Sequence, residues 1–353
     1  MTEEELRQYL MGTNEPLTTL DWLRDSFLPQ LREELRSTDV RRRLGIYEGE
    51  RIPENERNLT DVRNRVSLIL EYEMARIASR MLEAAEVTDL FWCYVVANRF
   101  PDLEVRDVQG HRGLRIEVKC LQTIAEEKSA NFDTLRKDIN PNTDFLAVFL
   151  WEWAAERDGV GWDRAPYVLE VYVFHCSTLA ALRDGYWLNN PPKRLGEGLQ
   201  GFDLRFAVNC TEGQYKEEEG NYGKLLRIWK PGSEFSPPDS ELMRRTISDY
   251  TTFKQKAILS GVESLAKLYL PTLGDANIAP IVQEGRIVGW SAGRASFVLK
   301  TLFENKRRLD DFLQNSPART VYVMTEKYSW CEYGTNQGNV TKVRNGAKPK
   351  FTQ

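Results

Sequence analysis

Two acids and a lysine stand at short spacing in the middle of the chain. Asp102 follows a proline at the start of one apolar segment, and Glu117 and Lys119 stand two residues apart in the next. Paired carboxylates are oxygen ligands of the kind that Mg²⁺ and Mn²⁺ prefer. A lysine on the same face can orient or deprotonate a water molecule while the metal polarises a phosphodiester. This spacing indicates metal-dependent hydrolysis.

The register of the two segments determines which acids meet. Apolar residues alternate along both, and they must face the core together, because a slip of one residue would turn one set to solvent. This register predicts a hairpin with a loop at residues 110–113, in which Asp102 lies beside Glu117 and Lys119. Asp107, ten residues before Glu117, is the alternative metal ligand, and the register ranks it second.

A third acid is expected from a long helix that begins at Thr60 and ends near residue 85. At about 100° per residue, the apolar stripe of this helix includes Glu73 and leaves Glu71 on the opposite face. A buried carboxylate needs a cation or hydrogen-bond donors. Glu73 is therefore expected either to point at the polar site or to pair with a nearby arginine.

The sequence Pro101-Asp102, a hairpin and Glu117-Val118-Lys119 resembles the motif of the PD-(D/E)XK nuclease superfamily. The resemblance implies that Asp102, Glu117 and the peptide carbonyl of Val118 bind Mg²⁺, for which Mn²⁺ can substitute. It also implies that Lys119 assists the water nucleophile.

The same resemblance covers about residues 60–175 and implies a restriction-endonuclease-like core. In that family an acid on the preceding helix often completes the site, a role that falls here on Glu73 or on Glu71. Gln122 occupies a position where some members place a polar residue that contacts the site or the DNA.

Among members of the superfamily, the chain is most similar to a type II restriction endonuclease, since its sequence contains no phosphate-binding loop or iron–sulfur cysteine set. This similarity implies sequence-specific cleavage of double-stranded DNA by a homodimer, with a cognate DNA methyltransferase in the same system. Two alternatives stay open. One is a structure-specific repair or defence nuclease of the same fold, and the other is a DNA-binding protein with an inactive nuclease fold.

Composition excludes several other classes. The chain has 353 residues, 41% of them hydrophobic, which is enough for two or three domains. Only two histidines occur, and the five cysteines stand too far apart for a structural zinc site. The N-terminus is acidic and no apolar run approaches the ~20 residues of a membrane span, so a cytoplasmic protein without membrane contact is expected.

Charge is segregated along the chain. Residues 241–353 contain 17 Lys and Arg against 10 Asp and Glu, a net charge of +7. Because the net charge of the whole chain is −4, the first 240 residues carry a net charge of −11. A basic C-terminal part is typical of polyanion binding or of solvated surface. Lys193, Arg194 and Lys224, which stand in polar segments, are the candidate DNA contacts.

The order of apolar segments predicts an α/β protein with a mixed sheet flanked by helices. Strands are expected at 91–100, 103–108, 114–120, 144–153, 167–174 and 202–208, with the aromatic ones in the core. Three parts are expected: a helical N-terminal appendage (1–57), the nuclease core (58–230) and a helical or mixed C-terminal region (240–353) for DNA recognition or dimerisation, with a basic tail. Within the last part, a helix is expected around 294–314 and a strand at 320–324.

Overall fold

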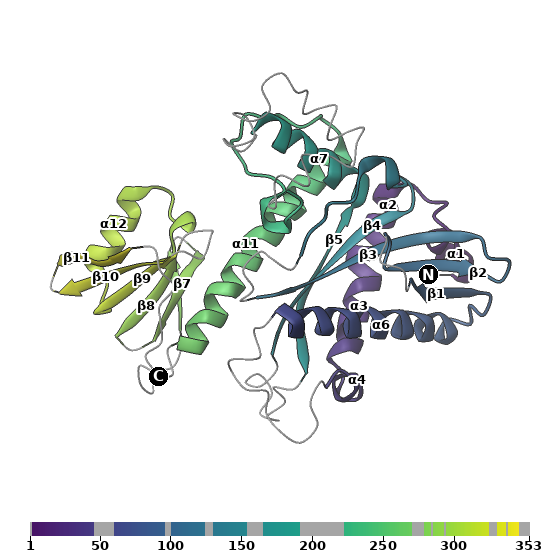
Figure 1. Cartoon of the computed structure of the whole chain (residues 1–353), viewed down its shortest axis with the longest axis horizontal. Coiled ribbons are helices and arrows are strands. Elements are labelled where there is room, and N and C mark those ends of the chain that lie inside the picture. The colour runs from purple at the N-terminus through teal and green to yellow at the C-terminus, as the bar shows by residue number, and fades with distance from the viewer. Residues whose placement is uncertain are drawn as a thin grey trace. The chain divides into compact units, whose positions relative to one another are not determined.

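Apolar periodicity organises the chain into two units, each with its own β-sheet (Figure 1). The computed structural model describes residues 2–45, 60–95, 100–123, 130–153, 165–190, 222–269, 279–283, 285–292, 294–324, 330–336 and 338–345. The first unit comprises Met1–Gln122 and Glu127–Phe253, and the second comprises Thr123–Glu126 and Lys254–Gln353. The chain is thus of the α/β class, with two mixed sheets.

The first unit is built on a five-stranded sheet in the order β1-β2-β3-β4-β5. β3 and β4 are parallel and the other neighbours are antiparallel. The bounds are β1 Leu90–Tyr94, β2 Leu103–Asp107, β3 Arg112–Gln122, β4 Asp144–Trp153 and β5 Pro166–His175. These five strands confirm the expected ones, and the expected strand at 202–208 lies outside the described residues.

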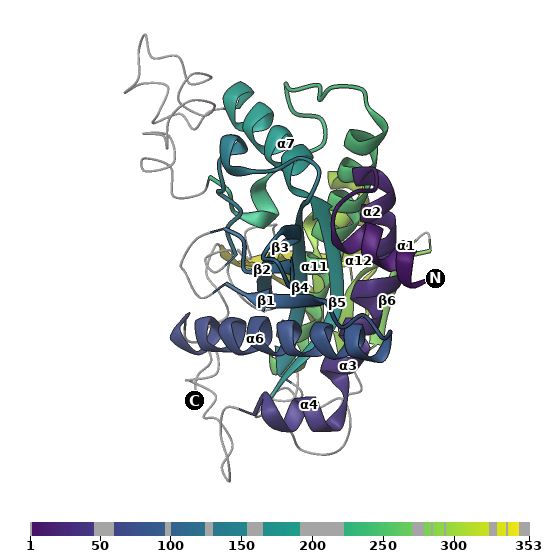
Figure 2. The same ribbon diagram turned by 90° about the vertical axis from the view of Figure 1, so that its right-hand side faces the viewer.

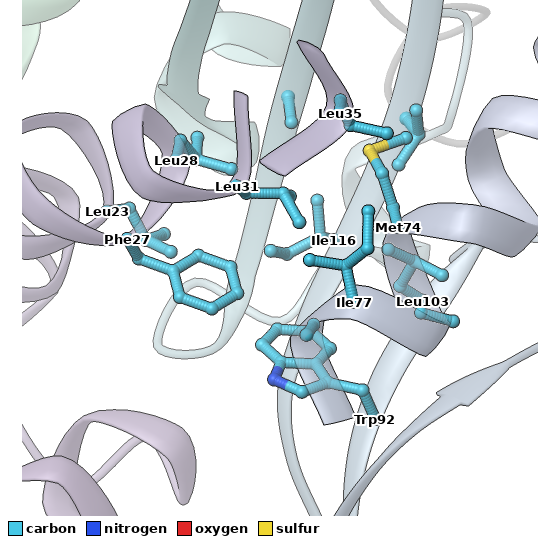
Figure 3. Packing of buried hydrophobic residues seen from close by; sticks show 14 of the residues in the cluster. Leu23, Phe27, Leu28, Leu31, Leu35, Met74, Ile77, Trp92, Leu103 and Ile116 are labelled. Atoms are coloured by element: carbon cyan, nitrogen blue, oxygen red, sulfur yellow. The ribbon is translucent and has the colours of Figure 1, made fainter. Parts of the chain in front are cut away.

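One face of this sheet is covered by α6 (Thr60–Ala84) and α3 (Leu28–Arg36). Figure 2 shows α6 crossing the strands with α3 beside it. Apolar side chains from both helices interlock with those of β1, β2 and β3 in Figure 3, among them Leu31, Met74, Ile77, Trp92 and Ile116. On the other face, aromatic rings of β5 pack edge-on against Phe253 of α11 (Glu241–Tyr269).

The N-terminal helices belong to the same core. They are α1 (Glu3–Leu10), α2 (Pro16–Trp22), a π-helical turn (Leu23–Phe27), α3 and α4 (Thr38–Arg43). Tyr9, Trp22, Phe27 and Trp92 stack in succession, which joins α1, α2 and the π-helical turn to β1. The described helices within residues 1–57 are therefore a layer of the first unit and not a separate appendage.

The second unit holds a six-stranded sheet in the order β11-β10-β9-β8-β7-β6, in which only β8 and β9 are parallel. Its elements are β6 Ala279–Gln283, β7 Arg286–Ala292, β8 Ala295–Leu299, α12 Lys306–Asn315, β9 Thr320–Met324, β10 Trp330–Asn336 and β11 Asn339–Asn345. The expected strand at 320–324 is confirmed. The expected helix around 294–314 is wrong in its first part, which forms β8.

The reason is that every residue of β8 is buried. A strand buried on both faces lacks apolar–polar alternation, so its sequence is not distinguishable by period from a buried helix. The boundary between the units also differs from the expected one between residues 230 and 240, because it falls within α11, between Phe253 and Lys254. In the described part of the chain, no helix has the length and apolarity to cross a lipid bilayer.

Close packing of α1 on the β2–β3 hairpin gives a test of the N-terminal layer. A Cβ at Gly113 would lie 2.2 Å from the Leu10 carbonyl oxygen and 2.9 Å from Met11 Cα. Gly113→Ala is expected to lower the free energy of unfolding by about 1–3 kcal/mol, because the end of α1 must move away. Thermal melting followed by circular dichroism measures the effect.

The matched control is Gly334→Ala in β10, where the added Cβ meets Val343 Cγ2 at an ordinary 3.5 Å. This variant is expected to melt within about 0.5 kcal/mol of the natural protein. Equal losses in the two variants would contradict the docking of α1 on the hairpin.

Candidate active site

Asp102 and Glu117 meet where β2 begins. Leu103 pairs with Ile116 in the antiparallel register, which places the preceding residue of β2 opposite the following residue of β3. Asp102 Oδ2 accepts a hydrogen bond from the Val118 N–H at 2.7 Å, so the carboxylate is fixed against β3 beyond the end of the β2 ladder. The predicted neighbourhood of Asp102 and Glu117 is thereby confirmed. The loop expected at residues 110–113 lies instead at residues 108–111, because the ladder between β2 and β3 has an irregularity between Glu104 and Arg106.

Lys119 contacts the second acid directly. Its Nζ donates to Glu117 Oε1 at 2.6 Å, and both side chains are largely buried. Glu117 Oε2 is also buried, and within the described residues it has no hydrogen-bond partner. One oxygen of the carboxylate is therefore held by the lysine, and the other remains available to a ligand.

Glu71 of α6 is the third acid of this group. Burial, followed by repulsion from Asp102, raises the pKa of Glu71 to about 8, and the Lys119 ammonium opposes this effect. The expectation that Glu71 lies on the solvent face is wrong. α6 packs against both the sheet and α3, so acids about 200° apart on the helix are both buried.

Glu73 has arginine partners. Its Oε1 lies 3.3 Å from Arg43 Nε and its Oε2 lies 3.0 Å from Arg76 Nη2. The burial expected from the apolar stripe is confirmed, and of the two roles left open the structure places Glu73 in the ion pair. The expectation that Glu73 joins the two strand acids is corrected accordingly: Glu71 is the acid of α6 whose pKa the charges of Asp102 and Glu117 help to raise.

Asp102, Glu117 and Glu71 outnumber the one lysine beside them, Lys119, and this affects the pKa of each group. Burial raises the pKa of Asp102 and of Glu117 above their usual values, although Lys119 works against it for both. Burial acts to lower the pKa of Lys119, but Glu117 and Asp102 hold it above its usual value. Glu71 and Glu117 are buried and Asp102 is half-buried, and a bound cation would favour the charged forms of these acids.

A hard divalent cation fits this donor set. The donors are carboxylate oxygens, one of them buried without a partner, and burial has already removed their hydration. Across the described residues, no three His, Cys, Asp or Glu side chains form a preformed metal cage. Mg²⁺ does not need one, because it is typically held by one or two carboxylates and keeps several waters.

Asp107, the alternative ligand, serves the hairpin turn. Its Oδ1 accepts from the backbone N–H groups of Gln109 and His111, and its Oδ2 lies 2.7 Å from His111 Nδ1. Both carboxylate oxygens are thus used in closing the loop between β2 and β3. The lower rank that the register gave Asp107 agrees with this placement.

Two of the candidate DNA contacts, Gln122 and Lys224, lie among the described residues. Gln122 ends β3 and is only 1% exposed, so contact with DNA is closed to it in this structure. Lys224 is half-buried and forms an isolated antiparallel bridge with Asn131. Lys193 and Arg194 lie outside the described residues.

Two residues near the acids were not predicted from the sequence. Tyr94 pairs with Leu103 across β1 and β2, which places it next to the Asp102 segment, and burial followed by the charges of Glu71 and Asp102 raises its pKa. Asp133 adds to the raised pKa of Glu117 after larger effects from burial and nearer charges. The three-strand register would have found Tyr94, whereas Asp133 follows from tertiary structure alone.

Comparisons of the chain with models of protein families, with curated proteins and with solved structures give no match.

The raised pKa of Glu71 predicts how stability depends on pH. Its pKa of about 8 in the folded protein exceeds the ~4.3 of an unfolded chain, so the folded state binds this proton more tightly. In chelator, the free energy of unfolding is expected to fall by roughly 2–4 kcal/mol as pH rises from about 5 to about 8. Glu71→Gln should flatten this decline and melt above the natural protein at pH 8.

Glu73→Gln is the matched control on the same helix. Removing this charge leaves Arg43 and Arg76 without their acid, so the melting temperature should drop at pH 8 instead of rising. A lower melting temperature for Glu71→Gln than for the natural protein at pH 8 in chelator would contradict the acid cluster.

Proposed function

We propose that this protein is a divalent-metal-dependent nuclease that hydrolyses phosphodiester bonds in DNA. The observation that carries the proposal is the placement of Asp102 and Glu117 side by side, with the Lys119 ammonium 2.6 Å from Glu117. Two acids and a lysine converging at a strand end support both metal binding and activation of water. Glu71, buried beside them, supplies the helix acid that the resemblance to PD-(D/E)XK nucleases implies.

Asp102, Glu117 and, by the same resemblance, the carbonyl of Val118 would hold Mg²⁺, with Mn²⁺ able to substitute. When bound, such a cation polarises the phosphodiester and acidifies a water molecule. The backbone N–H of Val118 orients the Asp102 carboxylate for this role. The unpartnered Oε2 of Glu117 is the free donor of the second acid.

Lys119 is held in its charged form by the acids around it. A charged ammonium donates hydrogen bonds to water and to phosphate oxygens but accepts no proton. Neutralising Glu117 and Asp102 with a cation would weaken this effect and lower the pKa of Lys119. In this proposal Lys119 orients the attacking water. Its pKa, and therefore its ability to accept a proton, depends on whether a cation is bound to Asp102 and Glu117.

For the substrate we favour double-stranded DNA cut at specific sequences by a homodimer, as in a type II restriction endonuclease with a restriction-endonuclease-like core. The net charge of +7 over residues 241–353 supports a polyanion as ligand. Such an enzyme needs a cognate DNA methyltransferase to protect host DNA. The structure-specific nuclease is the second candidate, and it is favoured by an exposed aromatic side chain, Tyr72, adjacent to Glu71.

Removal of either strand acid tests the proposal. Asp102→Asn and Glu117→Gln are expected to lower the rate of plasmid or phage DNA cleavage in Mg²⁺ by at least ~1,000-fold, because the cation loses a ligand. Glu73→Gln, scored per folded molecule, should stay within about threefold. Agarose gels of time courses measure the rates, and undiminished cleavage by Asp102→Asn would remove the metal site from the mechanism.

Substitution of the lysine separates catalysis from metal binding. Lys119→Ala is expected to slow cleavage by ~100-fold or more while DNA binding persists in Ca²⁺, because only the positioning of water is lost. Ca²⁺ should support binding but not cleavage by the natural protein. Equal cleavage in Ca²⁺ and in Mg²⁺ would contradict the proposed chemistry.

A further inference from the structure

Near its middle, α6 buries acidic side chains and exposes apolar ones, which is the reverse of the usual distribution. It buries Glu71 and Glu73, and it exposes Leu68 and Tyr72, whose exposed fractions are 54% and 59%. Buried acids and exposed large apolar residues are the informative departures from the rule that apolar groups lie inside. The burial of Glu71 and Glu73 is explained by the groups around them. Leu68 and Tyr72 contribute little to the core, so their exposure requires a separate explanation.

Tyr72 is paired with a second tyrosine. The rings of Tyr72 and Tyr94 meet edge-on, with centroids 6.1 Å apart and planes at 83°. Tyr94 packs against the core on one side and is half-buried, so it fixes the exposed ring of Tyr72 from behind. An edge-on contact leaves a face of Tyr72 open to solvent.

The tyrosine pair borders the acid cluster on two sides. Tyr72 follows Glu71 directly on α6, and Tyr94 precedes Val95, whose N–H donates to the Asp102 carbonyl at 2.8 Å. The charges of Glu71 and Asp102, after burial, also raise the pKa of Tyr94, which agrees with this proximity. Under the proposed function, a strand of DNA bound at Asp102 would lie near the open face of Tyr72.

The same side of α6 continues with Leu68 and Arg65, four and seven residues before Tyr72, and both are exposed. Arg65 and Tyr72 are about 10 Å apart along the helix axis at a rise of about 1.5 Å per residue. This side presents a cation, an apolar side chain and an aromatic ring in order, and it ends beside the acids. Proteins bind single strands with this combination: cations for the phosphates and rings for the bases.

We propose that Tyr72, supported by Tyr94, stacks on an unpaired nucleobase next to the phosphodiester that is cut. A base inside a duplex is covered on both faces by its neighbours, so stacking on Tyr72 requires a base that is single-stranded, at a strand end or turned out of the helix. The inference rests on the proposed nuclease function and specifies its substrate: DNA with an unpaired base at the site. This is the substrate class of the second candidate, the structure-specific nuclease, and an enzyme that cuts duplex DNA would meet it only by turning a base out of the helix.

A protein partner fits this surface less well. A stable interface involves 20–30 residues on each side, whereas the large exposed apolar residues recorded on α6 are Leu68 and Tyr72. Phe91 of β1 is exposed too, but strand alternation turns it to the opposite face of the sheet from Trp92 and Tyr94. Phe91 pairs with Arg106, four residues along β2 from Asp102 or roughly 13 Å at about 3.3 Å per residue, so it serves as the matched control for an exposed aromatic residue away from the site.

The test uses the full-length protein in Ca²⁺ with three fluorescent DNAs of the same sequence: a single strand, a full duplex and a duplex with one mismatched 2-aminopurine. Tyr72→Ala is expected to weaken binding to the single strand and to the mismatched duplex by about tenfold or more, and to the full duplex by less than threefold. Tyr72→Phe should bind like the natural protein, and so should Phe91→Ala. Stacking should quench 2-aminopurine fluorescence in the natural protein but not in Tyr72→Ala.

Three outcomes would overturn the proposal: unchanged binding and quenching in Tyr72→Ala, an equal loss on all three DNAs, or a change from dimer to monomer in sedimentation. The last would make this surface a protein interface. Failure of the nuclease proposal is read separately, from undiminished cleavage by Asp102→Asn in Mg²⁺. If the natural protein binds none of the three DNAs, both proposals fall.

Discussion

The first unit depends on one electrostatic constraint. The carboxyl groups of Glu71, Asp102 and Glu117 are held around Lys119, where water is largely excluded. Burying like charges is unfavourable, and the unfavourable part is visible in the raised pKa values of all three acids. The hydrophobic contacts of α6 and the N-terminal helices with the sheet offset this cost and keep the acids from separating. Sites that bind a cation or perform chemistry store such electrostatic strain, whereas structural acids acquire partners.

α6 shows both kinds of acid two residues apart. Glu73 has arginines on both carboxylate oxygens and belongs to the framework. Glu71 has like charges as neighbours and only a lysine to oppose them. The difference lies in what packs against each side of the helix: α4 and α6 itself supply the arginines, and the β2–β3 hairpin supplies the acids. The exposed Tyr72 then stands at the border between the buried acids and solvent.

The second unit differs from the first in its net charge. Its sheet is enclosed by two small cores, one of them formed with the C-terminal half of α11, and its sequence is basic where the first unit is acidic. An acidic region repels a polyanion unless cations are near, so the basic region in the same chain is consistent with the proposal that the ligand is DNA. The proposed stacking on Tyr72 further narrows that ligand to DNA with an unpaired base.

The sequence by itself determined the five strands of the first sheet, the long helix from Thr60, and the register that brings Asp102 to Glu117. These follow from local rules, because alternation fixes which residues share a face and a slip of one residue would expose a whole strand. The role of Asp107 could be ranked for the same reason. Even there, the sequence left open whether Glu73 meets the site or an arginine.

Only the tertiary structure decided between Glu71 and Glu73, because a helical wheel assumes one buried face and α6 has two neighbours. It also decided that the N-terminal helices join the core, since the stack from Tyr9 to Trp92 links residues far apart in sequence. The strand at Ala295–Leu299 was not predicted, because it is buried on both faces and therefore lacks the apolar–polar alternation that identifies a strand. The pairing of Tyr72 with Tyr94 arises in the same way, where a helix and a strand edge meet.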